Sequence, residues 1–367
     1  MTAGVNPVAS GAPELPGLAR DDRSDDGPHG SRTRTFVLTF FAVALVAAFL
    51  SPLVRALTIS FKTPDQISQP NSPVWPADPA TFSYQGQDYE LFKVPVDGGT
   101  RELALVKRGR TESDFIDPQN LAAGPFTVPG SWRTLDRVWT FAPEWGNYAQ
   151  VWDLINYPRL LLNTILLATI GTIGTVLSCT LVAYGFARFR FPGRQALFTL
   201  LIATIFLPAA VTLIPTYTIF YNLGWVGTWL PLLVPAFLAN AYDVFLLRQY
   251  FLTIPHDLDE AAAIDGAGPL RTLWSVVLPQ AWPALVAVAI FTFVYTWNDF
   301  FGPLIYLSTS QDLWPISVGL ASFNGIHYRN PALIQAGTLM ALVIPVFLFI
   351  VFQRFFTRGI VISGVEK

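Results

Sequence analysis

Long runs without a charged side chain constrain this chain most. Residues 35–54 carry no charge, and their length matches the roughly 20 residues that a helix needs to cross the hydrocarbon core of a bilayer. This run exceeds the apolar region of a signal peptide, about 7–15 residues, and no small-residue cleavage site follows it. A second uncharged run covers residues 160–187. The chain is therefore expected to cross a membrane more than once.

The uncharged run over residues 195–242 is too long for one crossing. Asn222, Gly224 and Gly227 mark a turn inside it, so it is predicted to form two spans joined by a tight loop. Further spans are expected near residues 281–306 and 331–353. Because backbone groups in lipid must bond within their own segment, all six spans are predicted to be helices. Prolines are expected to kink these helices without breaking the spans; they are Pro52, Pro208, Pro235 and Pro345.

Composition agrees with a membrane protein. Of the 367 residues 52% are hydrophobic and only 13% are charged, whereas a soluble domain carries about 25% charged residues. The apolar fraction also excludes disorder for most of the chain. A net charge of −2 gives no general attraction to nucleic acid. The single cysteine, Cys179, excludes an internal disulfide, and no Cys/His set has zinc-binding spacing, so no metal site is expected.

Arginines suggest the orientation in the plasma membrane. Six spans place both termini on one side, and that side has most of the arginines near the spans. By the positive-inside rule both termini are predicted to be cytoplasmic, and residues 61–158 extracytoplasmic. The arginines on the predicted cytoplasmic side are Arg32, Arg34, Arg188, Arg190, Arg194, Arg354 and Arg358.

The predicted organisation has five parts. These are a disordered cytoplasmic tail (1–34), a first transmembrane helix (35–60), an extracytoplasmic insert (61–158), a core of five helices (159–357, with a cytoplasmic loop at 248–280) and a C-terminal cytoplasmic tail (358–367).

The insert contains strand-like sequence. Residues 89–96 and 101–107 flank a turn at 97–100, which predicts a β-hairpin. Its core is expected to use tryptophans, and its role is either contact with an external partner or structural elaboration. The tryptophans are Trp75, Trp132, Trp139 and Trp145.

The cytoplasmic loop predicts a short helix with small side chains. Pro255 suits a first helical turn, and Asp257, Asp259 and Glu260 favour the positive end of a helix. Residues 261–263 are all alanine, a strong helix former. Gly266 and Gly268 are expected to end this helix. A second helix over 269–278 would return to the membrane, so the first helix could enter a cleft of another protein.

One pattern in this loop has fixed spacing. Glu260-Ala261-Ala262 is followed by Gly266, then Val276 and Leu278-Pro279. This pattern resembles the coupling motif of permeases of ATP-binding-cassette importers. Other segments agree in order, including 60–67, 183–194, 207–217, 222–233, 297–304 and 353–367. Together they resemble the MalG-type carbohydrate permease family over residues 36–67 and 145–367.

The resemblance implies a fold, partners and site residues. The fold is the all-α, six-helix type I importer permease, here with a small β-rich insert between helices 1 and 2. The implied partners are a second permease subunit, a homodimeric ATPase that binds ATP and Mg, and an extracytoplasmic sugar-binding protein. Glu260 would pair with a basic residue of the ATPase, and Gly266 would permit the turn. The implied docking residues are Glu260, Ala261, Ala262, Asp265, Gly266, Leu278 and Pro279.

The chain itself lacks the motifs of an enzyme. A phosphate-binding loop needs Gly-Lys followed by Ser or Thr, and none of the four lysines (Lys62, Lys93, Lys107 and Lys367) follows a glycine. Neither Gly-x-Ser-x-Gly nor His-Glu-x-x-His occurs. No catalytic residue and no cofactor of its own are therefore expected.

Alternatives remain open on sequence alone. An ion-coupled secondary transporter would place ionisable groups in the membrane, and Asp243 and Asp299 are the candidates. Asp243 is interpreted as an interfacial charge near the cytoplasmic end of span four, close to Arg248. The candidate translocation path comprises Tyr295, Trp297, Asn298 and Asp299, whose aromatic members either stack on sugars or pack. The solute is expected to be a sugar, with glycerol phosphate or a polyol as alternatives.

Overall fold

The computed structural model describes residues 28–96, 99–325 and 330–361. It divides into two compact units, residues 1–53 and 54–367, which are considered separately. Residues 1–27 and 362–367 of the predicted tails lie outside the described residues. Helix α1 (Pro28–Ser60) begins before residue 35, where the first span was predicted to start.

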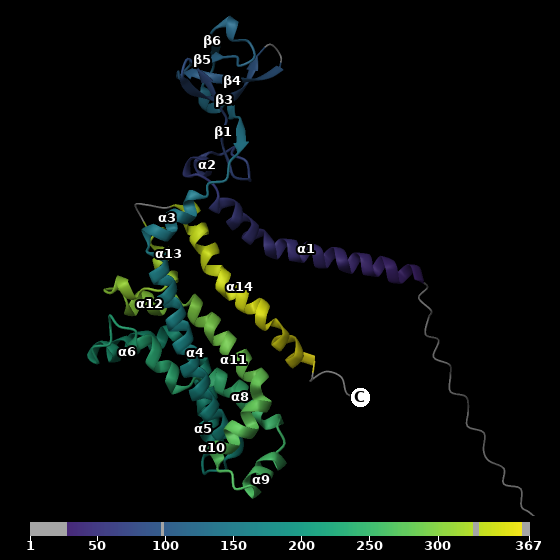
Figure 1. The fold of residues 1–367 in the computed structure, drawn as a ribbon, viewed down its shortest axis with the longest axis vertical. Helices are drawn as coiled ribbons and strands as arrows, with labels where there is room; N and C mark the ends of the chain where they lie inside the picture. Colours follow the sequence, from purple (N-terminus) through teal and green to yellow (C-terminus); the bar gives the residue numbers. More distant parts are fainter. Residues whose placement is uncertain (1–27, 97–98, 326–329, 362–367) are drawn as a thin grey trace, which may run out of the picture. The chain divides into compact units, whose positions relative to one another are not determined.

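The helices follow in a simple order (Figure 1). They are α2 (Pro64–Ser68), α3 (Gly146–Leu154), α4 (Tyr157–Arg188), α5 (Arg194–Ala203), η3 (Thr204–Phe206), α6 (Ala209–Asn222), α7 (Leu230–Leu233), η4 (Val234–Leu238), α8 (Ala241–Thr253), α9 (Asp257–Ile264), α10 (Pro269–Thr272), η5 (Leu273–Val277, a π-turn), α11 (Leu278–Asn298), α12 (Phe301–Tyr306), η6 (Gln311–Leu313), α13 (Ile316–Ala321) and α14 (Pro331–Val361). Two short 3₁₀ turns, η1 (Leu121–Ala123) and η2 (Trp132–Thr134), lie among the strands.

Five helical segments of the described residues are long and apolar enough to cross a membrane. The predicted third span consists of two helical pieces, Arg194–Phe206 and Ala210–Asn222, which meet at an angle of 102°. Pro208 lies at this break, where it cannot donate a backbone hydrogen bond. The five segments are Arg34–Ser60, Tyr157–Arg188, Leu230–Thr253, Pro269–Asn298 and Pro331–Gln353.

The fourth span is broken in its middle. Ala239 has a left-handed φ of 58° between η4 and α8, which is costly for a residue with a Cβ. Its amide donates to Ser178 Oγ of α4 at 3.2 Å. The Asn240 side chain then caps α8 by accepting from the Asp243 amide at 2.9 Å. Contacts from α4 thus hold the break in place.

This break corrects the prediction for Asp243. The span continues to Thr253 rather than ending at residue 242, so Asp243 lies in the first turn of α8 instead of near the end of the span. Its carboxylate accepts from the Asn240 side-chain amide at 2.7 Å. Arg248 lies elsewhere: it donates to the Phe186 carbonyl and covers the Phe198 ring at 4.1 Å.

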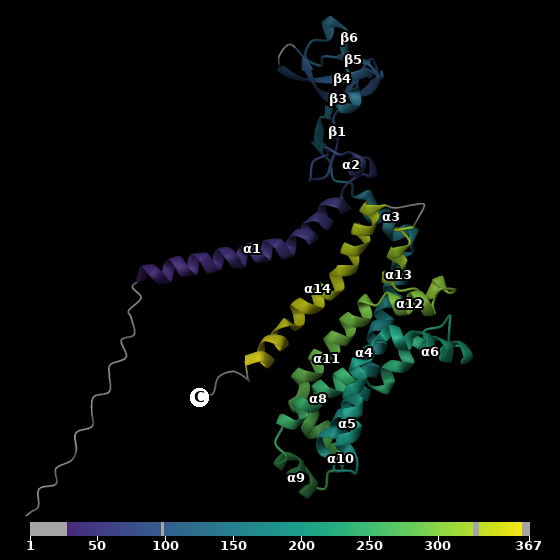
Figure 2. The ribbon, with the colours of Figure 1, turned by 180° about the vertical axis from the view of Figure 1, so that it is seen from behind.

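Helix α4 is central to the packing of residues 54–367. It lies beside α8 and α11 in both views (Figure 2) and contacts both along their length. Small residues on α4 allow a close approach: a Cβ added at Gly174 would lie 2.8 Å from the Phe237 ring of η4. The buried core between these helices is formed by Cys179, Ala183, Tyr184, Ala187, Val244, Leu247, Phe251, Ile254, Leu273, Val277, Ala281, Leu285 and Val288.

A second core joins α3, α4, α11, α13 and α14. Helix α3, which lies within the predicted insert, is tied to the end of α1: Asn147 donates to the carbonyls of Ser60 and Lys62 at 2.8 and 3.0 Å. The buried members of this core are Val151, Tyr157, Leu160, Ala168, Trp297, Ile316, Phe323, Leu333 and Ala336.

Residues 77–141 form the β-rich region. The strands are β1 (Ala77–Pro79), β2 (Thr81–Tyr84), β3 (Gln87–Val96), β4 (Gly99–Lys107), β5 (Glu112–Ile116), β6 (Phe126–Pro129), β7 (Asp136–Arg137) and β8 (Trp139–Phe141). Strands β2 to β6 form an antiparallel meander in chain order, β7 pairs with β3, and β1 pairs with β8. The β3–β4 pairing places Val96 opposite Gly99, as expected for the predicted hairpin.

The predicted tryptophan core of this region is wrong. The buried side chains are Phe92, Val94, Leu103, Leu105 and Phe115. Of the four tryptophans only Trp132 packs against them, while Trp75 and Trp145 are 55% and 68% exposed. Alternation along β3 and β4 turns alternate apolar side chains inward, and none of these is a tryptophan.

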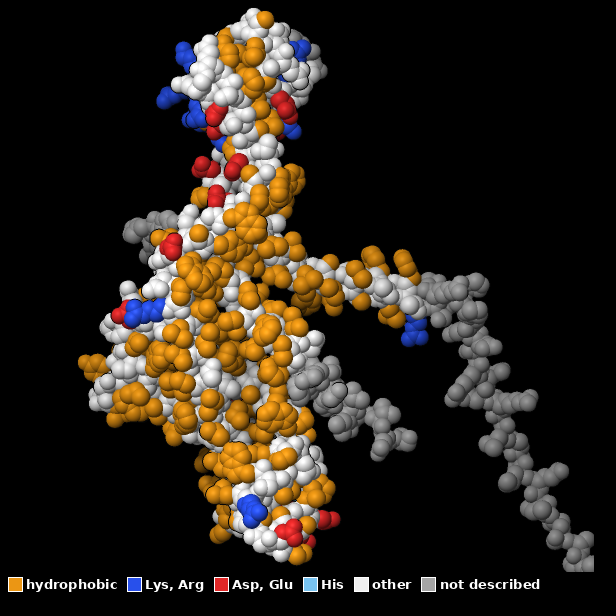
Figure 3. All heavy atoms as spheres, viewed as in Figure 1, with side chains coloured by type: hydrophobic (Ala, Val, Ile, Leu, Met, Phe, Trp, Pro, Cys, Tyr) orange, Lys and Arg blue, Asp and Glu red, His pale blue; other side chains and the backbone are white. Residues whose placement is uncertain are grey.

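The helices expose much apolar surface. Hydrophobic side chains cover the visible faces of the helices, whereas Lys, Arg, Asp and Glu gather on the β-rich region and near α9 (Figure 3). Apolar patches of this extent mark contact with lipid or with another apolar protein surface.

Candidate functional site

Helix α9 is a short, exposed helix with an acidic start. The His256 carbonyl accepts from the amides of Asp259 and Glu260 at 2.9 and 3.2 Å and so begins the helix. At the other end Gly266 adopts a φ of 77°, and its amide donates to Ala263 at 3.0 Å. Glycine tolerates this left-handed conformation, which ends the helix. Glu260 points into solvent from the first turn.

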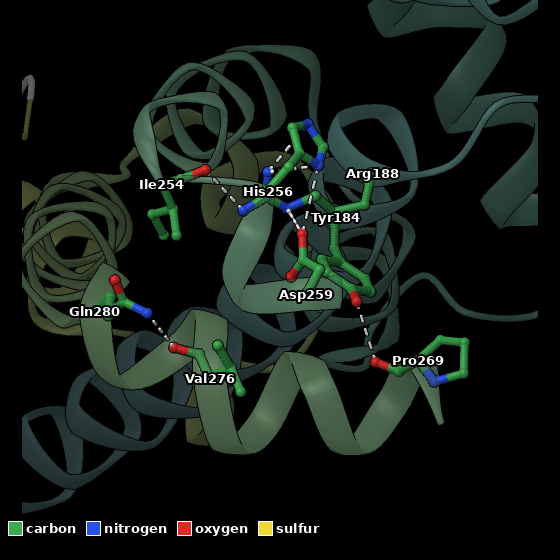
Figure 4. A network of polar contacts seen from close by, with 8 residues as sticks. All are labelled: Tyr184, Arg188, Ile254, His256, Asp259, Pro269, Val276 and Gln280. Atoms are coloured by element: carbon green, nitrogen blue, oxygen red, sulfur yellow. Dashed lines mark hydrogen bonds and ion pairs between the residues drawn. The ribbon is translucent and has the colours of Figure 1, made fainter. Parts of the chain in front are cut away.

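An ion pair attaches α9 to the end of α4 (Figure 4). Arg188 Nε lies 2.9 Å from Asp259 Oδ2, and the Arg188 side chain is only 5% exposed. The same guanidinium donates to the Ile254 carbonyl at 3.0 Å. His256 Nδ1 lies 3.5 Å from Asp259 Oδ2. We call Arg188, Ile254, His256 and Asp259 the loop clamp.

A second attachment holds the far side of the loop. The Tyr184 hydroxyl, one turn before Arg188, donates to the Pro269 carbonyl at 3.1 Å. Leu273 and Val277 then enter the buried core of α4 and α8. The predicted separate helix over 269–278 is in fact the start of the fifth span, which runs unbroken over Pro269–Asn298 through the π-turn.

The structure brings the predicted docking residues onto one segment. Glu260, Ala261 and Ala262 lie on α9, and Asp265 and Gly266 follow its end. Leu278 and Pro279 begin α11, where Leu278 is half-buried and Pro279 is exposed. Sequence reasoning did not foresee that Arg188 and Tyr184 hold this loop. The available signal was an arginine placed directly at the end of an uncharged span.

A cavity of about 650 Å³ opens between α4, the broken fourth span and α11. Tyr295 and Asp299 of the predicted path line it. Trp297 does not, because it is buried in the second core and stacks on Phe293. Asn298 is exposed and donates to the Val294 carbonyl at 2.8 Å. The other residues of the lining are Thr164, Leu167, Thr175, Leu232, Leu233, Ala236, Asn240, Tyr242, Asp243, Phe291, Thr292, Thr296, Pro303 and Pro315.

A span-bordered cavity and a projecting loop helix are features of a transport subunit, and comparison with known proteins agrees. Residues 174–360 match the family model described as "Binding-protein-dependent transport system inner membrane component". The chain belongs to this family. It is thus a membrane-spanning permease subunit and not an enzyme. Membership also excludes the alternative of an ion-coupled secondary transporter.

Curated relatives of this permease are also transport permeases. It is 34% identical over 223 residues to the osmoprotective compounds uptake permease GgtD of Synechocystis (60% of this chain, 75% of the relative). It is 34% identical over 249 residues to the diacetylchitobiose uptake permease NgcG of Streptomyces coelicolor (66% and 77%). It is 32% identical over 256 residues to the sn-glycerol-3-phosphate transport permease UgpE of Yersinia pestis (68% and 87%).

The fold of the permease matches a solved transporter. A chain of a bacterial ABC transporter involved in the import of the acidic polysaccharide alginate aligns with a TM-score of 0.63 and 18% identity, over 90% of this chain and 99% of that chain. This likeness confirms the predicted importer permease fold. The family match confirms the predicted placement in the inner membrane.

Proposed function

We propose that this permease forms half of the translocation path of an ATP-driven, binding-protein-dependent importer of a carbohydrate solute. The relatives that take up osmoprotective compounds and diacetylchitobiose support a sugar or sugar-like solute. The glycerol-phosphate relatives keep a phosphate ester as the second candidate. The proposed partners are a second permease subunit, a homodimeric ATPase and an extracytoplasmic sugar-binding protein.

The observation that carries this proposal is the position of α9. It is an exposed helix held between the fourth and fifth spans and clamped to the second. Movement of α9 must therefore reach three helices that surround or adjoin the cavity. The docking residues are proposed to be Glu260, Ala261, Ala262, Asp265, Gly266, Leu278 and Pro279.

A single contact does not supply the energy for transport. Reversing a conformational equilibrium from 1:99 to 99:1 takes about 5.5 kcal/mol, whereas one exposed ion pair at Glu260 contributes roughly 0–1 kcal/mol. Closure of the ATPase dimer on ATP must provide the difference, and α9 transmits the movement.

The topology is also proposed. The bent pair of α5 and α6 counts as one span, which gives six spans and places both termini in the cytoplasm. Residues 61–158 then lie outside, where the β-rich region is available to a binding protein. The arginines between the second and third spans, with α9, lie on the cytoplasmic side.

Co-purification and uptake test the proposal together. The tagged chain, expressed together with the other subunits of its transport system, is expected to purify with an ATPase and a second permease. Proteoliposomes of this complex are expected to take up solute only when ATP is in the lumen, on the side of the ATPase, and only when the binding protein is present outside. Uptake by this chain alone, driven by an ion gradient, would contradict the proposal.

A further inference from the structure

The lining of the 650 Å³ cavity combines two kinds of side chain. Exposed aromatic rings belong to this lining: Tyr242, Phe291 and Tyr295 are 57%, 51% and 78% exposed. The polar members are Asn240, the carboxylates of Asp243 and Asp299, and the hydroxyls of four threonines. Among the described residues that line the cavity, no side chain is Lys, Arg or His. Its fixed charge is therefore negative.

Asp243 occupies the position at which an anion would otherwise bind. A break within a membrane helix exposes the N-terminal amides of the following segment, and such an end attracts anionic groups. Here Asn240 Oδ1 accepts from the Asp243 amide at 2.9 Å, and the Asp243 carboxylate lies in that same first turn. Asp243 is 7% exposed. The start of α8 is thus already supplied with an acceptor and a negative charge.

Asp299 repeats this arrangement at the start of α12. Its Oδ1 accepts from the Gly302 amide at 3.2 Å. A Cβ added at Gly302 would lie 2.6 Å from Asp299 Oδ2, so the glycine is what allows the carboxylate to lie this close to the backbone. The second carboxylate of the cavity is therefore held in place by its own loop.

We infer that this cavity accepts an uncharged, polyhydroxylated solute and rejects phosphate esters and uronates. The inference rests on the proposed function and decides between its two solute candidates. Sugar hydroxyls can donate to Asp243, Asp299 and the two half-buried threonines of α11, while apolar C–H faces lie against the exposed rings. An anion that enters the same cavity lies close to the carboxylates of Asp243 and Asp299. Because water screens charges weakly there, the two carboxylates repel the anion strongly.

The identity of the solute is the first test. The binding protein that purifies with the complex is denatured and its bound solute is identified by mass spectrometry, and uptake of that solute and of sn-glycerol 3-phosphate is measured in proteoliposomes. An uncharged solute, with sn-glycerol 3-phosphate uptake at background, is expected. ATP-dependent import of a phosphate ester or uronate overturns the inference but leaves the proposed function intact. A complex that imports its bound solute without ATP contradicts the proposed function itself.

The carboxylates are tested by direct binding. Equilibrium dialysis of the radiolabelled solute against the complete complex, held with a non-hydrolysable ATP analogue and without binding protein, gives Kd. Asp243→Asn and Asp299→Asn keep a side-chain oxygen that accepts the hydrogen bond from Asn240 or Gly302 but lose the charge. Each is expected to raise Kd about tenfold or more, because hydrogen bonds to charged groups are the stronger class. The matched control is Asp312→Asn, an exposed carboxylate paired with Arg159 outside the cavity. Unchanged Kd in both cavity variants overturns the inference.

Discussion

Arg188 Nε lies 2.9 Å from Asp259 Oδ2, and this ion pair joins the end of α4 to the first turn of α9. Arg188 is 5% exposed and Asp259 is 21% exposed, so water screens the pair less than it screens a surface pair. The loop helix is consequently fastened to the second span as well as to the spans that precede and follow it.

Removing one partner of the clamp is expected to loosen α9. Arg188→Gln should lower the unfolding free energy by about 1–3 kcal/mol. This loss is smaller than the loss expected when one partner of a fully buried ion pair is removed, because Asp259 retains contact with water. A double-mutant cycle that combines Arg188→Gln with Asp259→Asn should give an interaction energy of about 1 kcal/mol between the two side chains. Thermal unfolding of the purified chain measures it. Exposed Arg190→Gln is the control. Additive effects of the two clamp substitutions would show that the pair contributes nothing.

Glu260→Ala is expected to separate folding from coupling. Glu260 is exposed in the first turn of α9, so its loss should change the unfolding free energy by less than about 0.5 kcal/mol. Solute-stimulated ATP hydrolysis by the complex should fall severalfold, because the helix loses its proposed pairing partner on the ATPase. Asp257→Asn in the same turn is the control. A Glu260→Ala complex that transports at the wild-type rate would remove Glu260 from the docking surface.

The end of α9 provides a pair of matched glycine variants. Gly266 has a φ of 77°, and a Cβ there meets nothing within 4 Å, so Gly266→Ala isolates the backbone cost of about 1–2 kcal/mol. Gly268 has a φ of −74° and equally open surroundings, so Gly268→Ala should be neutral. Thermal unfolding and solute-stimulated ATPase activity report both variants. Equal unfolding free energies of Gly266→Ala and Gly268→Ala would mean that the backbone at residue 266 can adopt a negative φ without cost.

Packing at the broken span predicts a second matched pair on α4. A Cβ at Gly174 would lie 2.8 Å from the Phe237 ring of η4, whereas one at Gly171 would lie 3.8 Å from Thr296. Gly174→Ala should therefore destabilise by about 1–3 kcal/mol through overpacking, and Gly171→Ala should be tolerated. Thermal unfolding and retention of the second permease subunit during purification measure the difference. Equal effects would indicate that η4 moves aside freely.

Lys62 predicts a dependence of stability on alkaline pH. Burial, with a smaller effect of the nearby Arg55 charge, lowers the Lys62 pKa from its usual 10.5, and its Nζ donates to the Pro73 carbonyl at 2.6 Å. Because the unfolded chain then binds more protons, this group makes the unfolding free energy rise as pH increases toward 10.5. In the Lys62→Met variant the unfolding free energy should no longer show this rise with pH. Denaturation midpoints of both chains between pH 8 and 10.5 test it, and parallel pH profiles would contradict it.

Local patterns predicted much of this molecule. Uncharged runs located the spans because lipid tolerates few charges, and the β3–β4 hairpin followed from strand-like runs around Gly98 and Gly99. The spacing from Glu260 to Pro279 located the loop. Each of these features depends on residues that are neighbours in the chain.

Features decided by distant contacts escaped prediction. The break at Ala239 itself carries no glycine or proline, although a kink was expected near Pro235 of the same span. The Ala239 amide bonds to Ser178 of another helix. The loop clamp likewise joins Arg188 to residues of the loop between α8 and α11. Trp297 is buried by α13 and α14, which no local pattern relates to it. Side-chain orientation in such cases is set by tertiary packing.

The π-turn at Leu273–Val277 has a consequence for the outer face of the fifth span. In a regular α-helix a step of eight residues turns about 800°, which leaves the side chain eight positions on about 80° from the first. A π-turn accommodates one extra residue, so the offset between Trp274 and Trp282 falls to about 20°. Both indoles are 58% exposed, and both line one apolar groove with Val176 and Leu177. One additional residue in a single turn therefore aligns the two indoles along one face of the fifth span.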